Sequence, residues 1–215
     1  MKSVLISIHP KWCGLIANGK KTVEVRKTKP NLETPFKVYI YCTESKSQNL
    51  MIRNVKECYF DDWGHLESFL VNQREAKTWF DKEDRANGKV IGEFVCDKIM
   101  LDIPRTLYAS HKTVVNSCVP IQELIDYVGK KNFLYFWHIS NLVIYDKPRN
   151  ITEFVTEGDC TCENCQKCKW FERGNGYNVE SDCLLPYTNS FGKAIKPLFR
   201  PPQSWCYVES EVERK

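Results

Sequence analysis

The stretch Gly19–Arg26 constrains the fold more than any other part of this 215-residue chain. From Thr22 onward, polar and β-branched residues alternate, which is typical of a strand with one face turned to the core. Successive side chains of a strand point to opposite faces. The polar face then holds Thr22, Glu24 and Arg26, and the inner face holds Val23 and Val25.

Three charged side chains gather around this predicted strand. Lys21 precedes it, at a turn where the alternation does not yet dictate direction, and Glu24 and Arg26 share one face. An arginine fork matches phosphate, and a glutamate accepts hydrogen bonds from the amino group of a base. The pattern predicts a site for an anionic or polar ligand. The alternative is an exposed strand face with internal salt bridges.

Other segments also show regular patterns. Pro10 fits a first helical position and Gly19 a left-handed cap, which predicts a helix over 10–18. Two further helices are predicted over 66–80 and 120–128. Strands are predicted over 4–8, 36–43, 89–101 and 133–145, the last as one strand or two, and Pro148 is expected to end that pattern.

Charge is unevenly distributed along the chain. The net charge is +4, yet residues 1–30 carry seven lysines or arginines against one acid, Glu24. Such a basic segment suits an anionic partner such as a nucleotide or RNA, although a solvated lysine-rich face would look the same. No apolar run approaches the roughly 18 to 20 residues that span a membrane, and no secretory signal is recognisable. We therefore expect a soluble, cytoplasmic protein without a membrane partner.

Cysteines dominate the last part of the chain. Four of them, Cys160, Cys162, Cys165 and Cys168, have the spacing C-x-C-x2-C-x2-C, and Cys183 follows. Thiols of a cytoplasmic protein stay reduced, and C-x2-C pairs suit tetrahedral zinc, so we predict a structural zinc ion. Two C-x2-C units overlap at Cys165, so Cys183 or Cys206 could replace one ligand. The alternative is a set of reduced cysteines without metal.

The change in composition after Pro148 predicts two parts. Residues 1–149 form the main domain, and residues 150–215 form a cysteine-rich tail. The last segment of the tail, Arg200–Val208, starts as a proline-fixed loop and ends strand-like, and it could return to the main sheet and close it.

The motif around the polar strand resembles a known family. Its residues Gly19, Lys21, Glu24 and Arg26 match the G-x-K-x-x-E-x-R motif of the ASCH domain family, a branch of the PUA-like β-barrels. The segments that also resemble cysteine-tailed members from bacteria and phages are Ile6–Pro10, Gly88–Phe94, Trp137–Ser140 and Pro201–Tyr207. The resemblance covers residues 3 to 150 and this last segment.

The resemblance implies an α+β fold: a PUA-like barrel with short flanking helices and a cleft beside the first helix. That cleft is proposed for the family to bind RNA or a nucleotide, and Lys21, Glu24 and Arg26 would line it. One relative, the bacterial N4-acetylcytidine amidohydrolase, works with a lysine and a threonine in this motif. Here Glu24 takes the threonine's place, so the same acyl-enzyme chemistry does not carry over.

Further ligand contacts are predicted on both sides of the motif. The candidates are His9, Trp12, Gln203, Ser204 and Trp205, since aromatic rings near cations stack bases and polar groups reach base edges. We therefore expect an RNA- or nucleotide-binding protein. A second hypothesis is a hydrolase acting on RNA or a modified nucleoside, either ribonuclease or amidohydrolase-like. There Glu24 would act as base, and Lys21 or Arg26 would stabilise the phosphate. A third is a protein-interaction adaptor.

Overall fold

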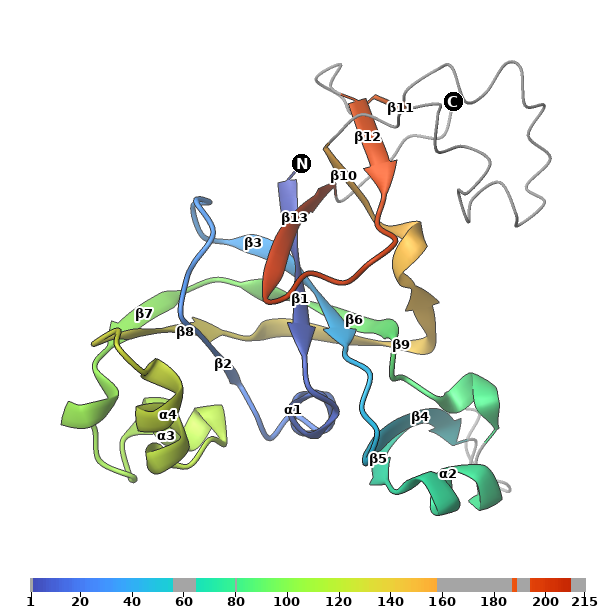
Figure 1. Cartoon of the computed structure of the whole chain (residues 1–215), viewed down its shortest axis with the longest axis horizontal. Helices are drawn as coiled ribbons and strands as arrows, with labels where there is room; N and C mark the ends of the chain where they lie inside the picture. The colour runs from blue at the N-terminus through green and yellow to red at the C-terminus, as the bar shows by residue number, and fades with distance from the viewer. Residues whose placement is uncertain (1, 56–64, 80, 158–186, 189–193, 210–215) are drawn as a thin grey trace.

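A five-stranded sheet forms the centre of the molecule (Figure 1). The computed structural model describes residues 2–55, 65–79, 81–157, 187–188 and 194–209. In the order β13-β1-β3-β6-β9, the strands of this sheet are Trp205–Glu209, Lys2–Ile8, Phe36–Cys42, Lys89–Cys96 and Ser140–Asn150. Strands β1 and β3 run parallel, and the other neighbours run antiparallel. Because β13 pairs with β1, residues near the two ends of the chain lie side by side.

A second sheet carries the polar strand of the sequence motif. Its order is β2-β8-β7, with bounds Val23–Arg26, Leu134–His138 and Ile99–Asp102. Helix α1 (Pro10–Ala17) leads into β2, and helices α3 (Lys112–Ser117) and α4 (Ile121–Val128) lie on the other side of that strand (Figure 1). Strand β2 is therefore flanked by helices from two separate parts of the sequence.

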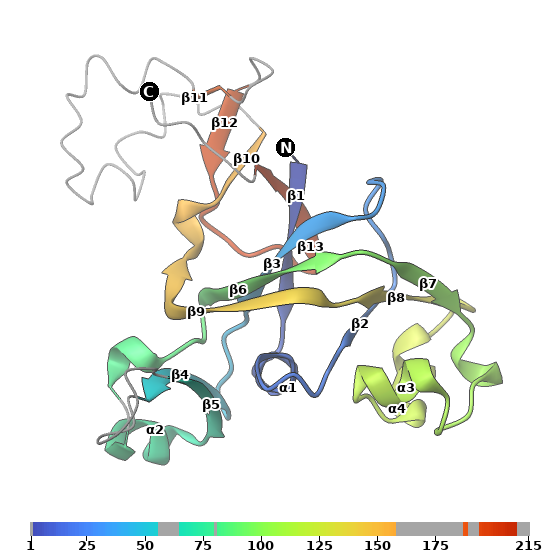
Figure 2. The ribbon, with the colours of Figure 1, turned by 180° about the vertical axis from the view of Figure 1, so that it is seen from behind.

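Two small sheets extend from the main sheet in different directions (Figures 1 and 2). One pairs β4 (Asn49–Val55) with β5 (His65–Val71) and is followed by α2 (Gln73–Trp79). The other has the order β10-β12-β11, with bounds Val155–Glu157, Ala194–Pro197 and Tyr187–Thr188. Short 3-10 turns lie at Lys82–Asp84, Pro104–Thr106 and Ile151–Glu153.

The core of the described residues has three clusters. In one of them the main sheet packs against α1, and its fully buried side chains include Ile6 of β1, Ile16 of α1 and Trp137 of β8. Val23 and Val25 belong to a separate cluster with residues of α3, α4 and β8. The predicted alternation of β2 is confirmed, since its valines enter this cluster. Each buried valine contributes about 1.5 to 3 kcal/mol, which holds the strand in register.

The predicted α+β class is confirmed, with several sheets and few helices. The barrel was expected to be closed, but the described strands form four separate sheets and close no barrel among them. In the described part of the chain, no helix is long and apolar enough to cross a membrane.

The helix predicted over 66–80 is wrong in its first half. Leu66, Phe69 and Leu70 have helical spacing, but residues 65–71 form β5, which pairs residue by residue with β4. Only Gln73–Trp79 is helical. Pairing with a strand that was not predicted outweighs the local pattern, because intrinsic propensity is a weak preference that tertiary context overrides.

Two strand boundaries also differ from the prediction. The strand expected over 89–101 is divided into β6 and β7, which belong to different sheets. Pro148 does not end β9, which continues to Asn150. Val90 of β6 pairs with Arg149 and Gly92 pairs with Ile144, so the residues of β9 between these pairs, Pro148 included, form a bulge. Strand β9 is also at the edge of its sheet, where a missing backbone N–H is tolerated.

Candidate functional site

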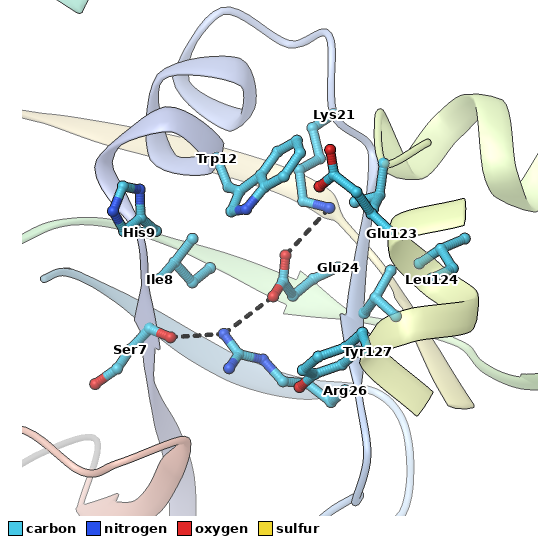
Figure 3. A pocket seen from close by; sticks show the side chains of 12 residues that line it. Ser7, Ile8, His9, Trp12, Lys21, Glu24, Arg26, Glu123, Leu124 and Tyr127 are labelled. Carbon is cyan, nitrogen blue, oxygen red and sulfur yellow. Dashed lines mark hydrogen bonds and ion pairs between the residues drawn. The ribbon is translucent and has the colours of Figure 1, made fainter. Parts of the chain in front are cut away.

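A pocket of about 260 Å³ lies between α1, β2 and α4 (Figure 3). Its lining combines apolar walls with a charged floor contributed by β2. The lining residues are Ser7, Ile8, His9, Trp12, Lys21, Glu24, Val25, Arg26, Val119, Glu123, Leu124 and Tyr127. Ligand pockets for drug-sized molecules have roughly 300 to 1,000 Å³, so this one suits a smaller group, about the size of a single nucleobase.

Glu24 lies on the floor of the pocket between two cations. Its side chain is 7% exposed; one carboxylate oxygen is 3.3 Å from Lys21 Nζ and the other is 3.0 Å from Arg26 Nη2. Figure 3 shows this carboxylate facing the cavity between Trp12 and Tyr127. A buried carboxylate held by two cations is a fixed acceptor with lone pairs left for a ligand donor.

Lys21 has all its donors engaged within the protein. Beside Glu24, its ammonium donates to the carbonyl of Val23 at 2.8 Å and to the carbonyl of Ser117 at 2.7 Å. Ser117 is the last residue of α3, so Lys21 satisfies an orphan carbonyl of that helix. An ammonium has three N–H groups, and three acceptors surround this one. Lys21 therefore holds Glu24 in place and has no proton left for an anion.

The turn before β2 explains why Lys21 points inward. Gly19 has a φ of +68°. The backbone N–H groups of Lys20 and Lys21 both donate to Leu15 at 2.9 and 3.0 Å, which ends α1 tightly. A left-handed residue at this position suits glycine, which has no Cβ to clash. The predicted glycine cap is thus confirmed.

Arg26 is only partly satisfied by the described residues. Its Nη2 donates to the carbonyl of Ser7 at 2.7 Å and forms the ion pair with Glu24. Its Nε is buried and has no hydrogen-bond partner in the described part of the chain. An unsatisfied buried donor lowers stability by about 1 to 3 kcal/mol, more for a charged group.

The C-terminal segment reaches the pocket through Ser7. The Ser7 hydroxyl donates to the carbonyl of Pro202 at 2.7 Å, and its backbone N–H donates to the carbonyl of Ser204 at 2.9 Å. Ser7 in turn accepts from Arg26. A continuous chain of contacts therefore joins the end of the protein to Glu24.

Aromatic rings from two helices form walls of the pocket. Trp12 comes from α1 and Tyr127 from α4, on two sides of Glu24 (Figure 3). Tyr127 is 39% exposed, and partial burial raises its pKa, so its phenol stays protonated near neutral pH. Lysines lie over both rings: Lys11 Nζ is 4.3 Å from the Trp12 ring centre, and Lys27 Nζ is 4.6 Å from that of Tyr127.

The structure brings five predicted ligand residues together. His9, Trp12, Lys21, Glu24 and Arg26 all line this one pocket. Their contact with a ligand remains a prediction.

Three other candidates, Gln203, Ser204 and Trp205, lie outside this lining. Trp205 packs against Trp137, with ring centres 6.3 Å apart, and its Nε1 donates to the Thr28 hydroxyl at 3.0 Å. Ser204 contacts Ser7 rather than the cavity.

Sequence reasoning missed Ser7, Glu123 and Tyr127. The last two are spaced i,i+4 on a correctly predicted helix and therefore share one of its faces. This spacing was a usable signal, but the partner of that face was not readable from the sequence. The role of the Ser117 carbonyl leaves no sequence signal, because every residue has a backbone carbonyl.

The predicted zinc ligands lie outside the described residues. These are Cys160, Cys162, Cys165, Cys168 and Cys183. Within the described ranges, no group of three or more His, Cys, Asp or Glu side chains is arranged to hold a metal ion. The zinc site remains a prediction of the cysteine spacing.

Residues 6–95 match the family model of the ASCH domain. This part of the chain is therefore similar to an ASCH domain, and the mixed α+β fold agrees with that similarity. The matched range includes α1 and β2, with Lys21, Glu24 and Arg26, but ends before α4, which supplies Glu123 and Tyr127.

Solved structures of an ASCH protein from Zymomonas mobilis have a similar fold. Its tyrosine-to-phenylalanine mutant has a TM-score of 0.50 at 16% identity, over 98% of this chain and 92% of that one. The unmutated protein has a TM-score of 0.47 at 16% identity, over 98% of this chain and 90% of that one. A serine-to-alanine mutant has a TM-score of 0.49 at 14% identity, over 97% of this chain and 89% of that one. At these identities the likeness concerns the fold alone. No curated protein matches significantly.

Proposed function

We propose that this protein binds RNA or a nucleotide by inserting one base into the pocket above Glu24. The buried carboxylate between Lys21 and Arg26 is the observation that carries the proposal. It offers a fixed acceptor with lone pairs left for a ligand donor. An amino group on the edge of a nucleobase is a donor that complements this carboxylate.

The walls of the pocket support a planar ligand. Trp12 and Tyr127 are amphipathic rings beside a charged floor, and base–aromatic stacking contributes about 1 to 3 kcal/mol per base. The small volume of about 260 Å³ favours one base over a larger group. The similarity of residues 6–95 to the ASCH family, which is broadly associated with nucleic acid, agrees with this chemistry.

Binding of short single-stranded RNAs by fluorescence anisotropy tests the proposal. Glu24→Gln keeps the shape of the side chain and removes its charge, so affinity should fall about 10- to 150-fold, the loss of one hydrogen bond to a charged group. Trp12→Ala should lower affinity about 5- to 150-fold through lost stacking. Circular dichroism confirms that each variant is folded.

A matched control is available on the main sheet. Glu93 also accepts from a lysine, Lys37, at 2.7 Å, but does not line the pocket. Glu93→Gln should leave RNA affinity unchanged. If folded Glu24→Gln and Trp12→Ala both bind like the wild type, the pocket is not the binding site.

A hydrolase is the second candidate, because a carboxylate held at a pocket floor can act as a general base. With an N-acylated base bound, Glu24 would take a proton from water as the water oxygen bonds to the acyl carbon. The C–N bond then breaks, and the proton passes to the departing amine. Release of free acid from N4-acetylcytidine, abolished in Glu24→Gln, would support this activity; binding without turnover would favour the binding protein.

The adaptor hypothesis depends on the cysteine-rich tail. Its residues 158–186 lie outside the described part of the chain, so no contact of the described residues favours it. It stays a prediction for the case in which the pocket binds no nucleic acid.

A further inference from the structure

The pocket itself is charge-balanced and unsuited to phosphate. Its charged lining consists of two cationic side chains, Lys21 and Arg26, and two anionic ones, Glu24 and Glu123. The Lys21 ammonium already faces three acceptors. A phosphate on the floor would meet the Glu24 carboxylate and find no free lysine proton, and like charges in close contact repel. The phosphates of a bound nucleotide must therefore lie elsewhere.

Two lysines that are not part of the pocket lining lie over its aromatic rings, one over each. Lys11 lies over the Trp12 ring and Lys27 over the Tyr127 ring, at 4.3 and 4.6 Å from the ring centres. In the described part of the chain neither ammonium forms an ion pair with a carboxylate. Their rings come from α1 and α4, which flank β2 from two sides (Figures 1 and 3). A cation thus lies against each of the two aromatic rings that line the pocket.

We propose that the ligand is an internal nucleotide of single-stranded RNA, whose flanking phosphates contact Lys11 and Lys27 while its base occupies the pocket. This inference rests on the proposed function and specifies its substrate class. A cation on each side favours a strand that crosses the opening over a free nucleoside, which could use neither lysine. A paired base would first have to leave its duplex, so single-stranded RNA should bind more tightly than double-stranded RNA.

Salt-dependent binding separates these ligands. The probes are the four ribonucleosides, the corresponding five-residue homopolymers and a double-stranded RNA, each titrated between about 50 and 200 mM salt. The variant Lys11→Gln with Lys27→Gln is compared with wild type. The matched control is Lys37→Gln with Lys196→Gln, since neither of these lysines lies over the Trp12 or the Tyr127 ring.

The wild type should bind at least one homopolymer more tightly than its nucleoside and than the duplex. In the Lys11/Lys27 variant the slope of log affinity against log salt should become shallower by about 1.4, because each single-strand phosphate contact contributes about 0.7. Nucleoside affinity should stay within about twofold of wild type. The control variant should keep the full slope for the homopolymer.

The results that would overturn the inference differ in whether they also contradict the proposed function. If the variant keeps the wild-type slope, or if nucleoside and homopolymer bind equally, the rim lysines contact no strand, although the base pocket stands. If the wild type binds neither nucleosides nor single strands, the proposed function fails with it. Tighter binding of the duplex would also contradict base insertion.

Discussion

Two clusters in this protein use the same residue types in different environments. In the pocket, Glu24 lies between Lys21 and Arg26, with side chains 2% to 10% exposed. On the main sheet, Glu93 accepts from Lys37 and from the Tyr145 hydroxyl, both at 2.7 Å.

The exposure of the second cluster differs sharply from that of the first. The side chains of Lys37 and Glu93 are 41% and 23% exposed. Burial would raise the pKa of Glu93, but the hydrogen bonds from Lys37 and Tyr145 outweigh it and lower that pKa. Burial and then the Glu93 carboxylate raise the pKa of Tyr145. This cluster is a solvated crosslink between strands.

The two clusters also differ in how fully their polar groups are hydrogen-bonded. Water can hydrogen-bond to the exposed part of the Glu93 carboxylate, whereas Arg26 Nε is buried and has no hydrogen-bond partner in the described part of the chain. Burying charges has a large desolvation penalty that stability alone does not explain. This difference supports our proposal that the pocket cluster binds a ligand and gives up some fold stability for a fixed geometry.

The largest expected effect comes from removing the buried carboxylate. Glu24→Ala leaves two buried cations without their counter-charge, so the free energy of unfolding should fall by about 3 to 5 kcal/mol. Urea denaturation measures it. Glu93→Ala, the exposed counterpart, should lose less than about 1 kcal/mol. Equal losses of unfolding free energy in Glu24→Ala and Glu93→Ala would contradict the proposed difference between the buried and the exposed cluster.

Lys21→Met should have a somewhat smaller effect. The thioether fills similar volume, but Glu24 keeps only Arg26, and the carbonyls of Val23 and Ser117 lose their donor. We expect a loss of about 2 to 4 kcal/mol in unfolding free energy. Thermal and urea unfolding measure the change. Lys37→Met is the control and should lose less than about 1 kcal/mol. If Lys21→Met is as stable as the wild type, Lys21 does not hold Glu24 and the two carbonyls as described.

Ser7→Ala tests the link between the C-terminal segment and the pocket. It removes the hydroxyl that donates to Pro202 but keeps the carbonyl that accepts from Arg26. One neutral hydrogen bond contributes about 0.5 to 1.5 kcal/mol, so stability should fall by that amount. Hydrogen exchange should increase in β13 and in the strand beside it. Unchanged exchange there would show that the hydroxyl does not hold the segment.

The smallest effect is expected from the pH dependence of Glu93. Its folded pKa lies below the ordinary value of 4.5, so it contributes stability above that pH and loses it as pH falls toward the folded pKa. Glu93→Gln should remove this contribution and flatten the acid limb of the stability curve by less than about 1 kcal/mol, less still in high salt. An acid limb that is unchanged in Glu93→Gln would mean that Glu93 has the same pKa in both states.

Local patterns predicted the elements whose signal is self-contained. The alternation of β2, the glycine cap after α1 and the proline-started helix α4 agree with the structure, because each depends on neighbours within a few residues. Residues 66–71 were misassigned because their strand state depends on β4. Pro148 was misjudged because tolerance of proline depends on the bulge and edge position of β9.

The sequence by itself determined the ASCH motif, the face of β2 on which Glu24 and Arg26 lie, and the basic character of the first thirty residues. Only the tertiary structure decided that Lys21 turns inward to a carbonyl of α3, that α4 supplies the second wall, and that Arg26 is anchored through Ser7. The physical reason is the range of the interactions. Alternation and capping act over one or two turns of chain, whereas burial of a charge depends on residues about a hundred positions away, such as Ser117.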